Sequence, residues 1–259
     1  MAFTQADEIR YFTFDLFPKS VTHGVFTRHG GVSPAPWDSL NVGGSVGDDP
    51  ARVRENRLRS FAALGRTCES IFDVHQVHSV NVVFADAPRS SETPYQQADI
   101  ILTDRPGITL FMRFADCVPV LLHDPRKNVI GVAHAGWIGT VRSAVSAAVE
   151  AMCSHYGSRA EDILAAIGPS IGPDHYVVGP DVVVQVMQAF GKDAENLLAS
   201  GDGMRFDLWA ANRLLLERAG VRQIALAGLC TVCHTKDWYS HRAQHGRAGR
   251  FGVLAALAG

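Results

Sequence analysis

One cysteine and two histidines near the middle of the chain have the residue types that metal chemistry needs. His78 lies in VHQVHS, Cys117 in ADCVPVLLHD and His134 in NVIGVAHAGW. A thiolate and two neutral imidazoles form a soft, three-ligand set that suits zinc or copper better than magnesium or calcium, and it leaves a fourth position open. No short ligand pair such as CxxC or HxxxH joins them, so two alternatives stay open. Cys117 could be a nucleophile with His134 as its base, or all three could be structural side chains.

A second group of candidate ligands lies in the sequence CTVCH, which contains Cys230, Cys233 and His234. The CxxC spacing occurs in redox motifs and zinc half-sites, and CxxCH is the pattern of covalent haem attachment. Haem attachment belongs to exported proteins, and the N-terminal sequence has no export signal. A second CxxC that would complete a structural zinc site is also missing from the sequence. We therefore expect this spacing to be a coincidence within a loop.

Arginine side chains in loops are the candidates for binding an anion. Arg28 stands beside a long glycine-rich loop, and Arg242 lies close to Ser240. A guanidinium group can hold phosphate through two parallel hydrogen bonds. The glycine-rich stretches do not match a nucleotide-binding pattern, so no nucleotide cofactor fold is expected. The glycines after His134 either leave a helix N-terminus open to an anion or only permit a turn.

Two short apolar strands must position Cys117 and His134. The runs VPVLLHD and NVIGVAHA are separated by a DPRK turn and predict a hairpin that is buried on at least one face. If the strands pair across that turn, both side chains lie at the opposite end of the hairpin. Asp116, next to Cys117, could orient a ligand histidine or cap a turn.

The rest of the chain predicts a sheet with helices added later in the sequence. A strand at 21–27 leads into a long loop, and Asp49 caps a helix that begins at Pro50. The runs DIILTD and ITLFMRF precede the hairpin and, lacking helical crossovers, are expected to form one sheet with it. A helix at 138–156 follows, and the last third mixes helices with strands. This order favours an α+β fold with a mixed, largely antiparallel β-sheet core flanked by helices, as a single compact domain over residues 1–259.

The composition describes an ordinary globular chain. It is 47% hydrophobic and 19% charged, with a formal net charge of −2. No block of like charge predicts a nucleic-acid partner or a membrane surface, and no apolar run approaches the roughly 20 residues of a bilayer span. The five cysteines are odd in number and scattered along the chain, so we do not expect a disulfide framework. We expect a cytoplasmic protein that acts on small molecules.

Eight motifs in sequence order give the chain a family resemblance. It is similar to the multicopper polyphenol oxidase, or laccase-domain, family, whose members are also described as purine nucleoside phosphorylases with adenosine deaminase activity and, for some, as peptidoglycan editing factors. The match runs from about Val21 to Gly252. The motifs are TRHGGVS, SLNVG, QVHS, ADCVPVLLHD, GVAHAGWIGT, AIGPSIGP, CT followed by WYSHR, and GRFG.

The resemblance implies roles for particular residues. It makes His78, Cys117 and His134 the metal ligands and catalytic centre, with zinc as the expected metal and copper as the alternative. Arg28 becomes a catalytic residue that contacts phosphate or substrate. The residues in matching motifs that would line the same pocket are Asn41, Gln76, Ser240 and Arg242. The chain departs from the family where Arg242 is followed by Ala243, because many members have a second arginine there.

The activity implied by the resemblance is a metal-dependent purine nucleoside phosphorylase. Its substrates would be phosphate and adenosine, inosine or methylthioadenosine, its products the base and sugar 1-phosphate, and adenosine deamination would be a second activity. A zinc-activated water is a suitable nucleophile for C6 of adenine. A hydrolase that edits peptidoglycan precursors and a mononuclear copper polyphenol oxidase are the alternatives. No HxH pair supplies ligands for a trinuclear copper cluster. His75 or His23 could protonate the departing purine.

Overall fold

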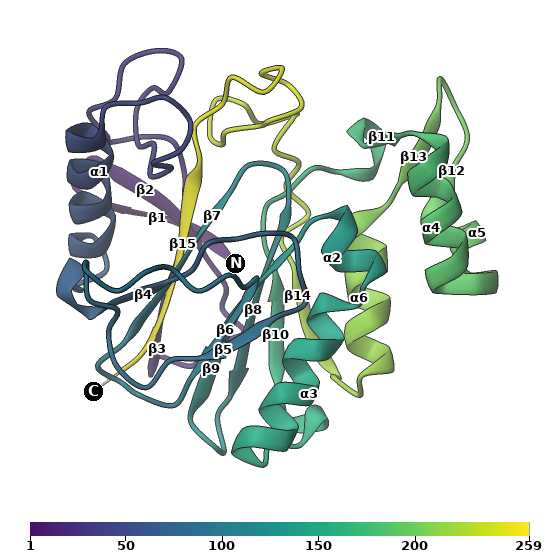
Figure 1. Ribbon diagram of the computed structural model, residues 1–259, viewed down its shortest axis with the longest axis horizontal. Coiled ribbons are helices and arrows are strands. Elements are labelled where there is room, and N and C mark those ends of the chain that lie inside the picture. The colour runs from purple at the N-terminus through teal and green to yellow at the C-terminus, as the bar shows by residue number, and fades with distance from the viewer. Residues whose placement is uncertain (259) are drawn as a thin grey trace.

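Two six-stranded β-sheets form the centre of the protein in the computed structural model, which describes residues 1–258 (Figure 1). The first sheet contains both the N-terminal strands and the last strand of the chain. Its strand order is β1 (Ala2–Ala6), β2 (Ile9–Thr13), β3 (Val21–Phe26), β15 (Phe251–Leu257), β7 (Thr109–Phe114) and β4 (Ile71–Asp73).

The second sheet contains the predicted hairpin. Its strand order is β14 (Gln223–Leu226), β10 (Leu164–Ile167), β8 (Val118–Asp124), β9 (Val129–Ala135), β6 (Ile100–Thr103) and β5 (Val82–Phe84). In both sheets the inner strands pair antiparallel, and the parallel pairs place β4, β5 and β14 at sheet edges. A small third sheet has the order β11 (Val177–Val178), β13 (Met204–Phe206) and β12 (Leu198–Ala199).

Helices cover the outer faces of the two sheets (Figure 1). Against the first sheet, Phe61 of α1 (Pro50–Ala62) packs on Phe111 of β7. The other side chains of this small core are apolar too, as expected for a helix laid on a sheet. The second sheet is covered mainly by α3 (Ala144–Tyr156) and α6 (Leu208–Arg218). The remaining helices are α2 (Trp137–Val141), α4 (Pro180–Phe190) and α5 (Ala194–Leu197).

The alternation of side chains along the strands explains why the central runs are apolar throughout. In β8, Val120 and Leu122 belong to the core under the helices, whereas Leu121 belongs to the core between the two sheets. The second sheet is therefore buried on both faces, and successive residues supply two different cores. Fully burying one such side chain contributes about 1.5–3 kcal/mol.

The predicted hairpin is confirmed. Strands β8 and β9 pair antiparallel, from Val118 opposite Ala135 at one end to Asp124 opposite Val129 at the turn. The α+β class with a mixed, largely antiparallel core is also confirmed. Asp49 caps α1 as predicted, since its carboxylate accepts from the amide of Ala51 at 2.8 Å.

Two predictions about the middle of the chain were wrong. The expected helix at 138–156 is split into α2 and α3, because Ser143 has a left-handed backbone with φ of 63° that interrupts the helix. The strand from the ITLFMRF run, β7, does not join the sheet of the hairpin. It pairs with β15 and β4 in the first sheet, so the chain crosses between the two sheets before returning to form β8.

Within residues 1–258, no helix combines the length and the apolar character that crossing a membrane would require.

Candidate metal centre

The structure brings His78, Cys117 and His134 together. The pairing of Pro119 with His134 places Cys117, just before β8, beside the C-terminal end of β9. His78 reaches the same point from the loop between β4 and β5. One ligand atom of each residue lies within 4.8 Å of the other two, and the Cys117 Sγ is 3.9 Å from the His78 Nε2. The rings of His78 and His134 are 4.9 Å apart.

A single carboxylate fixes both histidines. His134 Nδ1 donates to Asp99 Oδ1 at 2.8 Å, which leaves the Nε2 of His134 free to act as a ligand. The other oxygen of Asp99 accepts from the amides of Val77 and Ser79, on either side of His78, at 3.1 and 2.6 Å. The hydroxyl of Ser79 adds a third hydrogen bond at 2.8 Å. A carboxylate behind a ligand histidine fixes its ring orientation and makes it a better ligand.

The ionisation of the cluster favours a thiolate. Burial by itself would raise the pKa of Cys117, but His134 and His78 lower it to about 6. Burial would lower the pKa of His134, but Cys117 and Asp99 raise it to about 9. Burial would likewise raise the pKa of Asp99, but His134 and Ser79 lower it to about 2. Without a metal, Cys117 and His134 therefore form a thiolate–imidazolium pair at neutral pH.

The backbone around the cluster is specialised. His78 and Asp116 both have left-handed conformations, with φ of 60° and 82°. Such conformations are uncommon outside glycine and concentrate at functional sites. Gly136, at the start of α2, leaves room for the ligands, because a Cβ there would lie 2.7 Å from the Cys117 Sγ and 3.2 Å from the His78 ring.

These features fit a soft metal ion. The donor set of one thiolate and two imidazoles matches catalytic zinc sites that keep an open position, and the thiolate already forms near neutral pH. The close approach at Gly136 and the carboxylate behind His134 are the supporting features that such sites need. The same donors would accept copper.

Asp116 has a different role from the one considered from the sequence. The carboxylate that orients a ligand histidine is Asp99, not Asp116. Asp116 instead accepts from the hydroxyl of Thr231 and the amide of Arg242, both at 2.6 Å. It therefore fastens the C-terminal loops of the chain to the residue next to Cys117.

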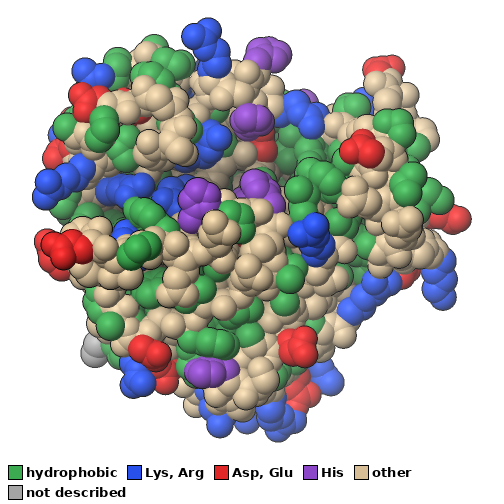
Figure 2. Space-filling model, in the orientation of Figure 1, with side chains coloured by type: hydrophobic (Ala, Val, Ile, Leu, Met, Phe, Trp, Pro, Cys, Tyr) green, Lys and Arg blue, Asp and Glu red, His purple; other side chains and the backbone are tan. Residues whose placement is uncertain are grey.

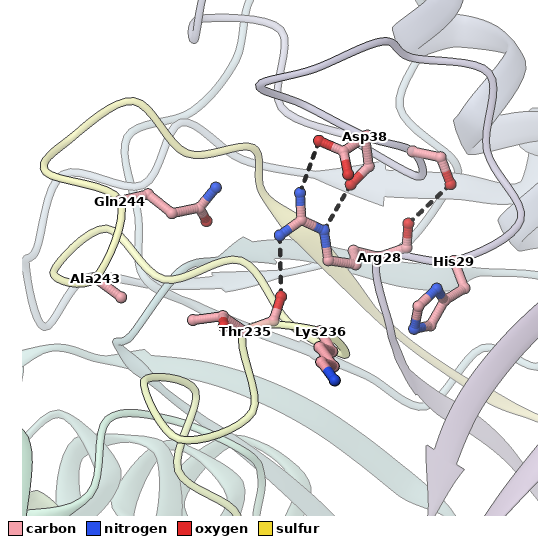
Figure 3. A pocket seen from close by; sticks show the side chains of 8 residues that line it. Arg28, His29, Asp38, Thr235, Lys236, Ala243 and Gln244 are labelled. Carbon is pink, nitrogen blue, oxygen red and sulfur yellow. Dashed lines mark hydrogen bonds and ion pairs between the residues drawn. The ribbon is translucent and has the colours of Figure 1, made fainter.

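Arg28 lines a cavity of about 610 Å³ between the long N-terminal loop and the C-terminal loop. Figure 3 shows its guanidinium pointing toward the loop that bears Gln244. It donates to the backbone oxygens of Asp38 at 2.6 Å and Thr235 at 3.0 Å, and it pairs with the Asp38 carboxylate at 3.0 Å. The guanidinium carbon of Arg28 lies 4.6 Å from the centre of the Tyr239 ring. The other seven lining residues are His29, Asp38, Ser39, Thr235, Lys236, Ala243 and Gln244.

The remaining predicted pocket residues hold backbone in place in this structure. Asn41 and Ser240 are fully buried; Asn41 bonds Gly43 and Arg250, and Ser240 accepts from the amide of Ala243. These hydrogen bonds indicate that Asn41 and Ser240 hold the loops in position. Direct contact of either residue with substrate stays a prediction.

Gln76 and Arg242 also bond to backbone, but both are more accessible. Gln76 makes two hydrogen bonds with the backbone of Arg113, at 2.9 and 3.0 Å. Arg242 is exposed, and its side chain donates to the carbonyls of His175 and Val177. Their binding of substrate likewise stays a prediction.

Some features of the site had no usable signal in the sequence. In the sequence, Asp99 is an ordinary aspartate that precedes a buried strand. Only the register of β6 against β9 shows that it meets His134. His175, from the segment before β11, lies beside Cys230 and Cys233, where His234 was the histidine considered from the motif. His23 is a buried acceptor for the amide of Phe14, and burial lowers its pKa to about 4, which disfavours the protonated form that a proton donor needs.

Comparison with known proteins gives one consistent family. The chain is 42% identical to a purine nucleoside phosphorylase of Deinococcus radiodurans, over 92% of this chain and 90% of that protein. It is 36% identical to the purine nucleoside phosphorylase YlmD of Bacillus subtilis, over 90% and 87%. The crystal structure of YlmD from Geobacillus stearothermophilus superimposes with a TM-score of 0.92 at 31% identity, covering 99% of both chains. The Bacillus licheniformis hypothetical protein YfiH gives a TM-score of 0.92 at 32% identity, covering 98% of both. The sequence profile of the multi-copper polyphenol oxidoreductase laccase family matches residues 22–258, and the chain belongs to this family.

Proposed function

We propose that this protein is a purine nucleoside phosphorylase whose catalytic centre is the cluster of His78, Cys117 and His134. The observation that carries the proposal is the convergence of these three ligand atoms within 4.8 Å, held by Asp99. The relatives named as purine nucleoside phosphorylases supply the substrate class. The reaction breaks the N-glycosidic bond, forms a bond between phosphate oxygen and C1 of the sugar, and transfers a proton to the departing purine.

Zinc is the metal that this proposal assigns to the cluster, with copper as the alternative. When bound there, zinc supplies Lewis acidity to the reacting groups. Asp99 keeps the Nδ1 proton of His134 directed away from the centre, so the Nε2 atom faces Cys117 and would serve as the ligand once a metal displaces its proton. The amides around His78 bond to the same carboxylate, so its imidazole is held by the loop as well as by the metal.

Phosphate binding is assigned to the cationic wall of the 610 Å³ cavity. Arg28 and Lys236 both line it, together with one carboxylate, Asp38, which pairs with Arg28. Arg28 is only 12% exposed at its side chain, and Asp38 is 59% exposed. An incoming anion can therefore displace the exposed carboxylate and pair with the largely buried guanidinium.

The cavity and the metal ligands are connected through Asp116. Asp116 precedes Cys117 in the chain and accepts from the amide of Arg242, and the next residue, Ala243, lines the cavity. Arg250 adds positive charge to the same region, because its charge interacts favourably with Cys117 and Asp116, although burial lowers its pKa. On the face of the molecule drawn in Figure 2, histidine side chains gather near the middle, beside lysine and arginine side chains.

Adenosine deamination is the second activity that we propose for this centre. It replaces the amino group at C6 of adenine with oxygen from water and releases ammonia. The same three ligands would serve, since a metal-assisted attack of water on C6 is the route of other zinc deaminases. The Cys117 thiolate and the two imidazoles would then act as ligands in both reactions.

The test is to identify products as well as turnover. Purified protein is incubated with inosine, with and without inorganic phosphate, and with adenosine, while bound zinc and copper are measured. We expect hypoxanthine and ribose 1-phosphate from inosine only when phosphate is present, and inosine from adenosine without it.

Three results would contradict the proposal. Free ribose in place of ribose 1-phosphate would indicate a hydrolase. Copper-dependent dioxygen uptake with phenols, without nucleoside turnover, would indicate a mononuclear oxidase. Full activity after exhaustive chelation would remove the metal from the mechanism.

A further inference from the structure

A second cluster of metal-ligand side chains lies beside the C-terminal loop. The Nδ1 of His175 is 3.7 Å from the Sγ of Cys230 and 3.6 Å from the Sγ of Cys233. The three atoms all lie within 4.8 Å of one another. At ordinary bond lengths, tetrahedral zinc separates a sulfur ligand from a nitrogen ligand by about 3.6 Å. Two edges of such a tetrahedron are therefore already formed.

We propose that His175, Cys230 and Cys233 bind a second soft metal ion, of the zinc class. Two thiolates and one imidazole are a donor set that selects zinc over magnesium or calcium. The two thiolates would neutralise the charge of a divalent ion, so the site needs no further acidic side chain. Water would complete the coordination at the exposed side, where His175 and Cys233 lie.

The buried side of this cluster is shaped around the sulfur of Cys230. The amide of Gly172 donates to the Cys230 Sγ at 3.2 Å, and hydrogen bonds to sulfur favour the thiolate that a metal requires. A Cβ at Gly172 would lie 3.1 Å from the Cys230 Cβ and 3.2 Å from its Sγ. The absent side chain therefore allows the backbone to approach the ligand closely.

Backbone hydrogen bonds set the positions of all three ligands. The backbone of Cys230 forms an isolated parallel β-bridge with that of Ser170, and the amide of Thr231 donates to the Ser170 carbonyl at 3.0 Å. The amide of His234 donates to the carbonyl of Cys230 at 3.0 Å, closing the turn that carries Cys233. His175 is held by its own amide, which donates to Gly172 at 3.1 Å.

A metal at this cluster would join two segments that also support the catalytic centre. The segment at 173–175 and the turn at 230–234 would be linked through it. The hydroxyl of Thr231 bonds Asp116, next to Cys117, and Arg242 bonds the carbonyl of His175. The role of the second metal is therefore structural: it holds the loop bearing Arg242 in place.

A redox role fits the same three residues less well. In a reactive CxxC pair the attacking cysteine is accessible and has a lowered pKa. Here the first cysteine, Cys230, is 7% exposed, and Cys233 is the accessible one. Desolvation and the neighbouring Cys230 raise the pKa of Cys233, which is opposite to the reactive case.

The test counts zinc in variants of the full chain. Protein purified under reducing conditions is loaded with Zn²⁺, dialysed and analysed for metal. We expect about two zinc ions per chain in the wild type, about one in Cys233→Ala or Cys117→Ala, and none in the double variant. Cys153→Ala, in α3 away from both clusters, is the matched control and should keep about two.

A second measurement separates this site from the catalytic centre. In the Cys117→Ala background, added Co²⁺ should give thiolate-to-cobalt charge-transfer absorption, and His175→Asn should weaken Co²⁺ binding by at least tenfold. Wild-type zinc content in Cys233→Ala, or no such absorption in the Cys117→Ala background, would overturn the proposal. A Cys230–Cys233 disulfide that persists under reducing conditions would overturn it too. These readouts do not depend on nucleoside turnover, so they stand apart from the proposed activity.

Discussion

The two histidine and cysteine clusters use similar ligands in different settings. The cluster of His78, Cys117 and His134 has one thiolate, sits at the end of a buried hairpin and has a carboxylate behind its deepest histidine. The cluster of His175, Cys230 and Cys233 has two thiolates, is built on turns, and has two exposed members. Ligands held in a fixed orientation around an open coordination position suit a catalytic metal. Two thiolates on a surface turn neutralise the charge of a divalent ion and suit a structural metal.

Removing one histidine from each cluster should separate the two roles most strongly. His78 has a φ of 60°, which asparagine tolerates, so His78→Asn removes the imidazole without forcing the backbone to change. We expect it to lower kcat/KM for inosine phosphorolysis by more than about a hundredfold, since a lost ligand should cost more than a lost supporting residue. His175→Asn should change the same ratio by less than about threefold, because it weakens the support of a loop and removes no ligand of the catalytic centre. Equal losses in the two variants would remove the distinction.

The carboxylate behind His134 gives the next largest effect. Asp99→Asn keeps the size of the side chain but weakens its hydrogen bond to His134 Nδ1 and its bonds to the Ser79 amide and hydroxyl. We expect zinc affinity and kcat/KM to fall by about 10- to 100-fold. Competition with a chelator measures the affinity. An unchanged dissociation constant would mean that the carboxylate does not support the ligand.

The space left by Gly136 gives a smaller effect. The backbone of Gly136 has a φ of −72°, which any residue adopts, so Gly136→Ala acts only through its Cβ, 2.7 Å from the Cys117 Sγ. We expect zinc affinity to fall by about tenfold as the ligands shift. Gly44→Ala is the control, because nothing lies within 4 Å of its added Cβ. Equal affinity in both variants would show that the close approach is unimportant.

Alkylation of the metal-free protein should give the smallest difference in rate and a clear difference in pH dependence. The pKa of Cys117 is lowered to about 6 and that of Cys233 is raised, so the rate at Cys117 should rise with pH to a plateau above about 6. The rate at Cys233 should still be rising at pH 9. At pH 7 the rates should differ only a few-fold, because a low-pKa thiolate is also a weaker nucleophile. Peptide mass spectrometry of chelated protein measures both sites, and coinciding profiles would contradict the assignment.

The hairpin could be predicted from the sequence because the signals were local. VPVLLHD and NVIGVAHA are apolar runs joined by a turn, and their pairing alone places Cys117 beside His134. The assignment of β7 to the first sheet could not be predicted. Both sheets have buried inner strands, so an apolar run such as ITLFMRF fits either sheet equally well. The break between α2 and α3 depends on one left-handed serine, for which the sequence gives no warning.

The supporting residues were harder to predict than the ligands. Asp99 meets His134 through the pairing of β6 with β9, a contact between segments 35 positions apart. His175 meets Cys230 across 55 positions, whereas His234, adjacent in the motif, was the obvious candidate. Motifs reveal neighbours along the chain, but the partners that orient a metal ligand are chosen by tertiary packing.

The central claim is that nucleoside chemistry depends on the cluster of His78, Cys117 and His134 and not on the cluster of His175, Cys230 and Cys233. Its most direct test compares kcat/KM for phosphate-dependent cleavage of inosine in Cys117→Ala and Cys233→Ala, after circular dichroism has verified that both are folded. We predict a loss of more than about a hundredfold for Cys117→Ala and less than about threefold for Cys233→Ala. Wild-type activity in Cys117→Ala, or an equal loss in the two variants, would contradict the account.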